Sequence, residues 1–410
     1  MLPQTLKFVQ EKFLEYYKSA FQESWIPISF KNREFGVLLF KEKTMVRHRS
    51  FKRPNEVREF LCEFVPSDVY YSSAYYEDPA ANEMSQKHWL GADLVFDIDA
   101  DHIPTSCGKV HDRWVCGNCG FSGKGITPDK CPSCGRQKID AKTWICEECL
   151  ETTKKETRKL LDFLMGDFGF SVDEVKVYFS GHRGYHVHVE SETARSLDQL
   201  ARKEIVDYIV GIGLDTSLYG VKEKGKMLTG PNLSDAGWEG RIARGVYETF
   251  QNFSVQELEN IGLTKVVAGA ISRQRNEAVE SWKRKGPWNV VSGVGGESWK
   301  RLVQSGIKLQ SAQIDTVVTT DVHRLIRLGD TLHGKTGLKK TTVPHGRLDE
   351  FDPLKSAVAF EKGTAEIFVH ESPEFRVGDT VYQPFKEQKV ELPVAAALFL
   401  LCKGAAEVTT

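Results

Sequence analysis

The spacing of apolar residues predicts a chain of irregularly alternating helices and strands. Apolar side chains recur at helical spacing over residues 5–24 and 151–165, which predicts an amphipathic helix in each segment. Residues 92–99, 174–180 and 185–190 have the short, alternating pattern of strands. The irregular order of these elements favours an α/β or α+β fold with mixed sheets flanked by helices.

The later part of the chain carries weaker signals. Residues 220–245 are rich in glycine and show no hydrophobic period, so we expect a long loop there. Ser254-Val-Gln-Glu257 is a capping box, which predicts the start of a helical stretch that continues towards residue 285. We expect a short strand at 357–360 and a buried helix near residues 393–403.

The charge balance is nearly neutral, with 55 Lys and Arg against 56 Asp and Glu and a formal net charge of −1. This balance excludes a uniformly basic nucleic-acid coat but leaves room for local basic patches. The longest apolar run, residues 394–402, is too short to span a bilayer, and the N-terminus lacks a signal-peptide core. We therefore expect an intracellular, cytoplasmic protein with no membrane partner.

Seven of the nine cysteines fall between Cys107 and Cys149, which indicates metal binding rather than disulfides. Two CxxC turns predict an outer zinc ribbon with four cysteine ligands, made of Cys116, Cys119, Cys131 and Cys134. The remaining ligands predict an inner zinc site with three cysteines and one histidine, made of Cys107, His111, Cys146 and Cys149. Both sites would be structural, because neither shows an open coordination position.

A different partition of these cysteines stays open from the sequence. Cys146 and Cys149 could combine with one ribbon turn, which would give a single site and spare thiols. Under either partition, residues 107–149 are predicted to form a zinc-binding insertion. The insertion would interrupt one catalytic domain that comprises residues 1–106 and 150–410.

An Asp-x-Asp pair ends the strand predicted at 92–99. Asp97 and Asp99 project to one face of that strand, where the two carboxylates repel each other unless a cation lies between them. The alternative is a strand end that passes into a polar loop. Oxygen ligands of this kind suit Mg²⁺ or Mn²⁺, and Asp315, in a predicted short strand, could supply a third carboxylate.

The connection between the strands at 174–180 and 185–190 carries groups that suit a triphosphate. Ser180 and His186 would lie on opposite sides of this tight turn, with Arg183 at its tip. A hydroxyl, an imidazole, a guanidinium and glycine amides can all bind phosphate oxygens. The alternative is an ordinary hairpin with exposed polar residues.

The segment Gly329–Thr336 fits the P-loop pattern letter for letter, but its context argues against a P-loop. A P-loop follows a strand and opens a helix, whereas this segment follows an apolar pattern that reads as a helix and leads into a poor helix former. The segment nevertheless gathers basic residues, which include Arg324, Arg327, His333 and Lys335.

Three motifs that occur in order resemble the catalytic small subunit of archaeal and eukaryotic DNA primase. The likeness extends from residue 33 to residue 398 and includes a zinc insertion just after the Asp-x-Asp strand. The motifs are Gly91-Ala-Asp-Leu-Val-Phe-Asp-Ile-Asp99, Ser180-Gly-His-Arg-Gly-Tyr-His186, and residues 319–327 continued by Leu332-His-Gly-Lys-Thr-Gly337.

The resemblance implies the archaeo-eukaryotic primase catalytic fold and a role for each motif. It makes Asp97, Asp99 and Asp315 the catalytic carboxylates that hold two Mg²⁺ or Mn²⁺ ions. It assigns nucleotide binding to Ser180, Arg183, His186, Arg327 and His333. It also places Glu34, Arg47 and Asp68 along the active site.

The activity implied by the resemblance is that of a nucleotidyltransferase, a DNA-directed RNA or DNA polymerase that makes short primers de novo on single-stranded DNA by two-metal-ion phosphoryl transfer. Its partners would be a primase large subunit, in a heterodimer, together with single-stranded DNA and nucleoside triphosphates. The likeness also implies a nucleoid-associated protein from an archaeal source. Two alternatives remain: an Asp-x-Asp, Mn²⁺-dependent glycosyltransferase and a non-enzymatic zinc-ribbon adaptor for nucleic acids.

Overall fold

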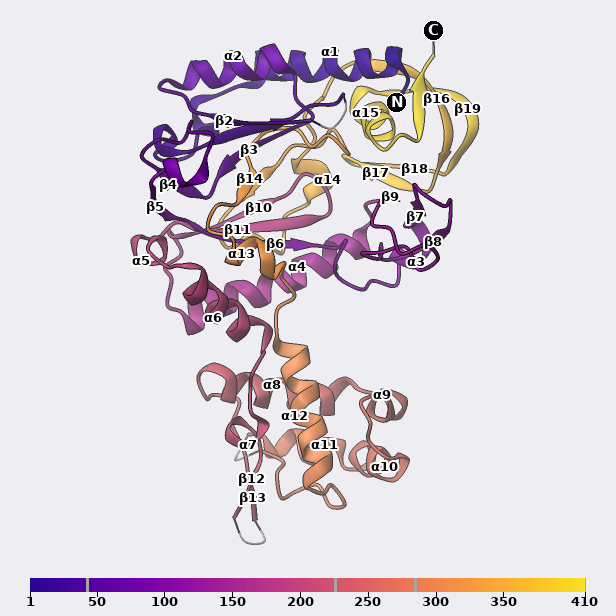
Figure 1. Cartoon of the computed structure of the whole chain (residues 1–410). Helices are drawn as coiled ribbons and strands as arrows, with labels where there is room; N and C mark the ends of the chain where they lie inside the picture. Colours follow the sequence, from indigo (N-terminus) through magenta and orange to yellow (C-terminus); the bar gives the residue numbers. More distant parts are fainter. Residues whose placement is uncertain (42–43, 225–226, 284–285, 410) are drawn as a thin grey trace. The chain divides into compact units, whose positions relative to one another are not determined.

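The computed structural model divides the chain into two compact units (Figure 1). Unit 1 comprises Met1–Arg158, Phe170–Lys203 and Ile314–Thr410, and unit 2 comprises Lys159–Gly169 and Glu204–Gln313. The structure describes residues 1–41, 44–224, 227–283 and 286–409. Residues 107–149 fall within unit 1 by this division, so their independence as a domain stays a prediction.

Two four-stranded sheets form the centre of unit 1. The first sheet has the order β14-β3-β1-β2 and contains β1 (Phe35–Leu38), β2 (Met45–Arg49), β3 (Asp68–Ser72) and β14 (Leu325–Arg327). The second sheet has the order β15-β10-β11-β6 and contains β6 (Leu94–Asp99), β10 (Val175–Phe179), β11 (Gly184–Val189) and β15 (Thr341–Val343). We call these the first sheet and the second sheet.

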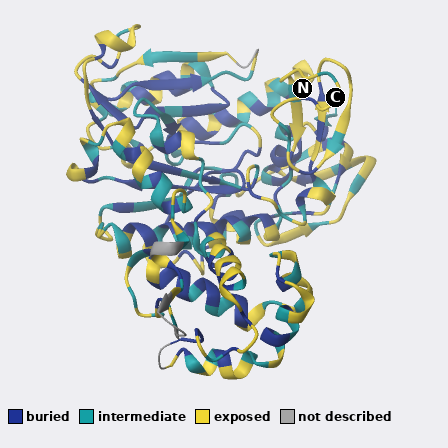
Figure 2. Ribbon diagram, turned by 60° about the horizontal axis from the view of Figure 1, so that its bottom comes forward, coloured by how far each residue is buried: buried dark blue, intermediate teal, exposed yellow. Residues whose placement is uncertain are grey.

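Burial of alternate side chains explains how β6 is oriented. Leu94, Phe96 and Ile98 are buried, whereas Asp97 and Asp99, which point the other way, stay partly exposed. Strand β11 lies between β10 and β6 and is buried at every position, as the dark strands at the centre of Figure 2 illustrate. The second sheet therefore presents its acidic positions on its edge strand β6, which the buried strand β11 holds in place.

Helices and smaller sheets surround these strands. Helices α1 (Pro3–Ala20) and α2 (Pro54–Phe64) pack on each other, and the apolar helix α15 (Val394–Cys402) packs on β16. The C-terminal sheet has the order β19-β16-β20, with β16 (Thr364–Ser372), β19 (Phe385–Pro393) and β20 (Ala406–Val408). Shorter elements are β4 (Ala74–Tyr76), β5 (Trp89–Ala92), α5 (Glu192–Arg195), α13 (Thr316–Thr320), α14 (Pro353–Ser356), β17 (Phe375–Val377), β18 (Thr380–Tyr382) and 3-10 turns at Glu23–Trp25, Phe30–Asn32 and Met84–Gln86.

The cysteine-rich segment forms a small sheet of its own. Its strand order is β8-β7-β9, with β7 (Arg113–Cys116), β8 (Ser122–Lys124) and β9 (Ile139–Lys142). The short helix α3 (Gly108–His111) precedes the sheet, and α4 (Glu147–Asp162) follows it and continues into a π-helical turn at Phe163–Asp167.

Unit 2 is mostly helical. Gly245 of α8 and Gly306 of α12 let the two helix backbones approach closely, because a Cβ on Gly245 would lie only 2.4 Å from the carbonyl oxygen of Gly306. Besides the end of α4 and the π-helical turn after it, the elements wholly or partly in this unit are α6 (Gln199–Val210), α7 (Thr216–Tyr219), β12 (Lys222–Lys224), β13 (Met227–Thr229), α8 (Gly237–Asn252), α9 (Val255–Asn260), α10 (Lys265–Arg273), α11 (Arg275–Ser281) and α12 (Gly296–Gln310).

Several local predictions are wrong. The expected loop at 220–245 contains strands β12 and β13, which pair with each other, and the whole first half of α8, although residues 225–226 lie outside the described part. The glycines obscured the helix signal because Gly240 and Gly245 allow close packing rather than mark a loop. Residues 357–360 form no strand, since they follow the short helix α14, which Asp352 caps.

The capping box at Ser254 is confirmed, but it opens three short helices, α9 to α11, instead of one, and residues 284–285 lie outside the described part. The predicted α/β class is also confirmed. The strand pairs of the described residues are antiparallel throughout, so the individual sheets are not mixed. Within the described ranges, no helix has the length and apolar character needed to cross a membrane.

Candidate active site and metal centres

The Asp-x-Asp strand and the Ser180–His186 motif face each other in the second sheet. In the β6–β11 ladder, His186 pairs with Asp97 and Gly184 pairs with Asp99. The Nε2 atom of His186 lies 3.6 Å from Oδ1 of Asp97. Gly184 is required at this crossing, because a Cβ there would lie 2.1 Å from the carbonyl oxygen of Ile98. The second sheet therefore places the two motifs on adjacent strands.

Asp315 joins this pair from a distant part of the chain. Its backbone amide donates a 2.8 Å hydrogen bond to the carbonyl oxygen of Asp97. The predicted short strand around Asp315 is wrong, since Asp315 is the N-cap of α13 and its Oδ1 accepts from the amides of Val317 and Val318. An N-cap position suits a carboxylate, because the first amides of a helix lack partners within the helix.

The electrostatics of the site call for a cation. Burial, followed by the charges of Asp99 and Asp315, raises the pKa of Asp97 to about 7. Burial and the neighbouring charge of Asp101 also raise the pKa of Asp99. Clustered carboxylates with raised pKa values are stabilised by a divalent ion, which replaces the lost hydration and cancels the repulsion.

Asp101 and His182, which the sequence did not single out as ligands, place possible ligand atoms close to Asp99. Among the described residues, Asp99, Asp101 and His182 bring one possible ligand atom each within 4.8 Å of one another. The triple Asp97, Asp99 and Asp315 does not meet that spacing. Asp101 follows the motif by two residues, so its acidity was visible in the sequence, but its closeness to His182 depends on the sheet.

The predicted nucleotide-binding residues fall into two groups. Ser180 and His186 flank the β10–β11 turn, and both are buried. The Nδ1 atom of His186 has no hydrogen-bond partner among the residues that the structure describes. A buried ring nitrogen without a partner is costly, so this atom is available to a ligand or an ordered water.

Arg327 and His333 form the second group and converge on Asp68. Arg327 makes a 2.6 Å ion pair with Asp68, and Nδ1 of His333 lies 3.7 Å from the same carboxylate. The amide of Gly334 donates to Asp68 as well, at 3.2 Å. Burial alone would raise the pKa of Asp68, but the charges of Arg327 and His333 hold it below its usual range. The carboxylate of Asp68 therefore holds Arg327, His333 and Gly334 close to one another.

Glu34 and Arg47 form a separate ion-pair cluster on the first sheet. Nε of Arg47 lies 2.9 Å from Glu34, whose side chain is fully buried. Nζ of Lys87 reaches the same carboxylate at 3.5 Å. The sequence had not marked Lys87, because nothing in its local pattern separates it from a surface lysine.

Arg183 differs most from its predicted role. Its side chain is only 2% exposed, so the guanidinium at the tip of this connection is not open to solvent. Nε donates to Asp101 at 2.6 Å, and one terminal nitrogen donates to Asp112 at 2.7 Å and to the carbonyl oxygen of Trp144 at 3.2 Å. These protein partners occupy the guanidinium that the sequence assigned to a triphosphate.

Asp112 continues these contacts from Arg183 to the inner cysteine site. Its Oδ1 lies 2.7 Å from Nδ1 of His111 and accepts from the amide of Trp144. At the other end, the amide of Asp101 donates to Oδ1 of Asp99 at 2.9 Å. A chain of contacts therefore connects His111, through Asp112, Arg183 and Asp101, to Asp99.

The structure brings both predicted cysteine sets together as two separate clusters. In the inner cluster, Sγ of Cys107 lies 3.3 Å from Sγ of Cys149, and Nε2 of His111 lies 3.3 Å from Sγ of Cys146. The mixed partition is not formed. All nine cysteines are free, and each cluster contains the soft ligands that zinc prefers.

The outer cluster has the spacing of a tetrahedral site. The Sγ atoms of Cys116 and Cys134 lie 3.6 Å apart, and those of Cys119 and Cys131 also lie 3.6 Å apart. A zinc ion with Zn–S bonds of about 2.3 Å requires edges of about 3.8 Å. The donors present therefore fit a bound zinc ion, whose identity stays a prediction.

The P-loop pattern at Gly329–Thr336 is a decoy, as predicted, but for only one of the two stated reasons. Strand β14 does precede it, so the predicted helical approach is wrong. No helix follows: the segment continues through a turn to an isolated bridge between Leu332 and Lys339. Without a helix N-terminus, the loop has no amide cradle for phosphates.

Comparison with known proteins identifies the family of the chain. Residues 129–344 match the family described as DNA primase small subunit. The chain is 34% identical to the DNA primase small subunit PriS of Methanococcoides burtonii, with 98% of each chain covered. It is 34% identical to the protein of the same name from Methanothrix thermoacetophila over all of both chains, and 33% identical to that from Archaeoglobus fulgidus over 98% of each.

These likenesses span nearly the whole chain and include both sheets and the cysteine segment. The prediction of a primase catalytic subunit is confirmed, and a nucleotidyltransferase is the class of enzyme that it implies. The glycosyltransferase and adaptor alternatives are not favoured. The chain belongs to the DNA primase small subunit family.

Proposed function

We propose that this chain synthesises short primers de novo on single-stranded DNA, as the catalytic subunit of a primase that transfers nucleotidyl groups with two metal ions. The observation that carries the proposal is the meeting of Asp97, Asp99 and Asp315 on and beside strand β6. Clustered carboxylates on a rigid strand, opposite a histidine, can hold divalent ions against phosphates.

Asp97, Asp99 and Asp315 would hold Mg²⁺ or Mn²⁺, with Asp101 and His182 as neighbouring donors around Asp99. When bound, the ions would activate the 3′-hydroxyl of the primer end and neutralise charge on the leaving diphosphate. The chain itself supplies the orientation, because the β6–β11 ladder fixes two carboxylates and the N-cap of α13 fixes the third.

Ser180, His186, Arg327 and His333 would bind the triphosphate of the incoming nucleotide. The unpartnered Nδ1 of His186 and the Arg327–His333 group around Asp68 support this assignment. Arg183 is better described as a positioning residue. Its guanidinium holds Asp101 beside Asp99, and it places a buried positive charge near the catalytic carboxylates.

Both cysteine clusters would hold zinc in a structural role, since each offers four protein ligands and leaves no coordination position open. Glu34 and Arg47 would stabilise the first sheet rather than contact the nucleotide, because they are paired with each other. The near-neutral charge of the chain fits a division of labour with a primase large subunit, in which template affinity is shared.

The test is primer synthesis on single-stranded DNA with nucleotides and Mn²⁺. The double variant Asp97→Asn, Asp99→Asn should lose activity by about 100-fold or more. It lacks two of the carboxylates that would hold the metal ions, and with them the ions' stabilisation of charge on the phosphates. Asp173→Asn provides the matched control, since Asp173 is an exposed aspartate outside the site. Equal product from the double variant and the wild type would contradict the metal assignment, provided that both proteins melt cooperatively.

A further inference from the structure

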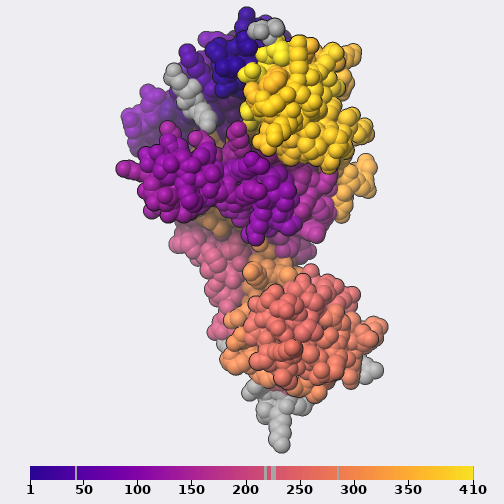
Figure 3. Space-filling model, turned by 90° about the vertical axis from the view of Figure 1, so that its right-hand side faces the viewer, coloured from indigo at the N-terminus to yellow at the C-terminus, as the bar shows by residue number. Residues whose placement is uncertain are grey.

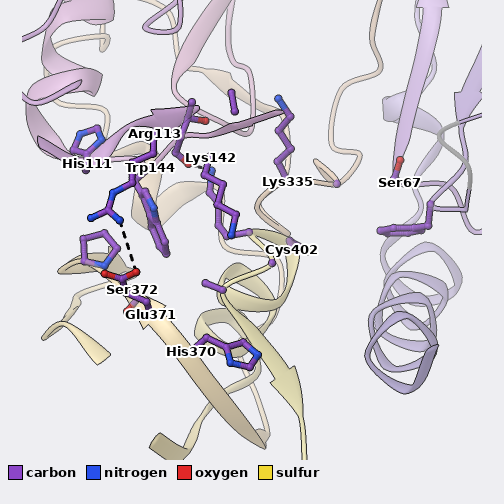
Figure 4. Close-up of a pocket in the computed structure, with 18 of the residues that line it drawn as sticks. Ser67, His111, Arg113, Lys142, Trp144, Lys335, His370, Glu371, Ser372 and Cys402 are labelled. Atoms are coloured by element: carbon purple, nitrogen blue, oxygen red, sulfur yellow. Dashed lines mark hydrogen bonds and ion pairs between the residues drawn. The ribbon is translucent and has the colours of Figure 1, made fainter. Parts of the chain in front are cut away.

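A cleft of about 940 Å³ lies between the cysteine segment and the C-terminal sheet, within unit 1. Figure 3 shows the C-terminal residues, in yellow, against the magenta cysteine segment on this face. Arg113, Lys142 and Trp144 line one wall, and Glu371 lies on the wall opposite, across the Arg113–Glu371 ion pair (Figure 4). We call this space the basic cleft.

Two of the three acidic side chains that line the basic cleft already have cationic neighbours. Asp68 is paired with Arg327, and Glu371 lies 3.9 Å from Arg113. The third, Glu387, lies 3.8 Å from His370. Asp68 and Glu371 therefore do not neutralise the lysines around them.

Three lysines of the cleft have no carboxylate partner among the ion pairs of the described residues; they are Lys142, Lys335 and Lys403. Lys403 donates to the carbonyl oxygen of Thr143 at 2.8 Å and lies 2.9 Å from Nε2 of His182. Both of these partners are uncharged groups when His182 is neutral. The cleft thus keeps an excess of positive charge.

This excess makes the cleft a site for an anion. Lys335 and Lys403 both line it, and among the described residues neither has a carboxylate partner that would compete with the anion. Phosphate groups are the anions that the proposed reaction brings to this region.

The row of basic residues is longer than a binding site for one nucleotide requires. Lys335 lies two residues after His333, which belongs to the proposed triphosphate group. At the other end, Arg113 and Lys142 also line a second hollow on the outer ribbon, which adds Lys124. Residues 113–142 carry six Lys and Arg against two Asp.

The ribbon also offers an aromatic surface. The side chain of Phe121 is 46% exposed and lies near Trp114, with ring centroids 6.0 Å apart. Exposed aromatic rings among basic residues are typical of proteins that stack the bases of single strands. A protein partner would use the apolar surface but would not need the row of lysines.

We propose that the basic cleft and the outer ribbon bind the sugar–phosphate backbone of single-stranded DNA that continues from the active site. This inference rests on the proposed function, since it assigns the template strand of that reaction to a particular surface. Lys335 and Lys403 contact phosphates nearest the nucleotide, Arg113 and Lys142 contact phosphates farther along, and Phe121 stacks on a base.

The test uses the full-length double variant Arg113→Gln, Lys142→Gln, which leaves the proposed metal and triphosphate residues intact. Binding of a fluorescent oligothymidylate is measured by anisotropy between about 50 and 200 mM salt. We expect affinity to fall about tenfold at low salt, and the salt slope to fall by about 0.7 for each phosphate that the variant no longer neutralises. Phe121→Ala should weaken binding about fivefold with an unchanged slope.

The control is the double variant Lys7→Gln, Lys362→Gln, which removes two exposed lysines outside the cleft and should leave the affinity unchanged. Binding of nucleoside triphosphate with Mn²⁺, measured by calorimetry, should be the same in all variants.

An unchanged DNA affinity and slope in the Arg113, Lys142 variant would overturn the proposal. So would loss of nucleotide binding alone, because the cleft would then belong to the nucleotide site. If wild type binds DNA through the cleft but makes no primer, the proposed function fails while this inference stands.

Discussion

The inner and outer cysteine clusters each bring four zinc-type ligands together but are held by the fold in different ways. In the inner cluster, Cys149 is fully buried, and His111 is oriented by Asp112, which also contacts Arg183. In the outer cluster, Cys119 is exposed, and the supporting backbone bonds run within the ribbon, such as the one from Gly120 to Cys116.

This difference bears on what each metal ion would do. A carboxylate behind a metal-binding histidine fixes the ring and tunes the ligand, and here the same carboxylate also reaches the catalytic strand through Arg183. The inner site is therefore expected to act as a support for the active site. The outer site is expected to act as a self-contained module that stabilises the ribbon.

The largest effect should come from removing an inner ligand. Cys146→Ser should abolish most primer synthesis and lower the melting temperature, because structural zinc sites contribute about 10 kcal/mol or more in small domains. Cys119→Ser should leave synthesis on short templates within about threefold, since the ribbon lies outside the catalytic contacts. Zinc analysis should give about one equivalent for each variant against two for wild type. Equal loss of activity in both variants would remove the distinction between the clusters.

A smaller effect is expected from the link between the inner cluster and the catalytic strand. Asp112→Asn should weaken zinc retention and activity by about 10- to 100-fold, the usual range for carboxylates behind a metal ligand. Competition with a coloured chelator measures zinc retention separately from activity. Asp140→Asn, an exposed aspartate on β9, is the control. Wild-type retention in the Asp112 variant would contradict the positioning role.

Arg183→Lys tests the part of this link in which Arg183 connects Asp112 to Asp101. The lysine keeps the charge but cannot contact Asp101, Asp112 and Trp144 together, because it lacks the planar fork of arginine. We expect about a tenfold higher Mn²⁺ concentration for half-maximal synthesis, with nucleotide affinity changed by less than about twofold. A loss of nucleotide affinity alone would return Arg183 to the triphosphate site.

Replacement of the ribbon should have a modest effect. Strand β7 pairs directly with β9, with Cys116 opposite Ile139, so an Asn-Gly turn can replace residues 117–138 in a chain that also carries Cys116→Ser. This variant should lose one zinc equivalent and bind single-stranded DNA more weakly. It should still extend an annealed primer at about the wild-type rate if the ribbon is a separate module.

The smallest effect is the pH dependence of stability, which comes from the carboxylates of the proposed metal site and not from either cysteine cluster. Folding raises the pKa of Asp97 from 3.8 to about 7, so the folded state binds the proton more tightly. Without divalent ions, the free energy of unfolding should therefore fall as pH rises from about 4 to 7, and Mn²⁺ should restore it above pH 7. Melting curves with and without Mn²⁺ measure this, and Asp97→Asn should weaken both the pH dependence and the Mn²⁺ effect, while Asp99, whose pKa is also raised, keeps part of each.

Local patterns predicted much of the local geometry around these residues. The alternation of β6 placed Asp97 and Asp99 on one face, and the tight turn after Ser180 placed His186 on the partner strand. The CxxC spacing fixed the outer cluster, and the ligands left over gave the inner one. These features depend on neighbours a few residues apart, whose geometry follows from strand and turn periodicity.

The tertiary structure decided the features that depend on distant residues. Asp68 meets Arg327 across 259 positions, and Arg183 meets Asp112 across 71. Nothing in the turn around Arg183 shows that its guanidinium is buried between two aspartates. The sequence alone determined which chemical groups the chain carries and which of them share a strand or a turn. Packing alone decided which of those groups are already neutralised by each other and which remain free to bind a ligand, because burial and partner charges arise only when separate elements come together.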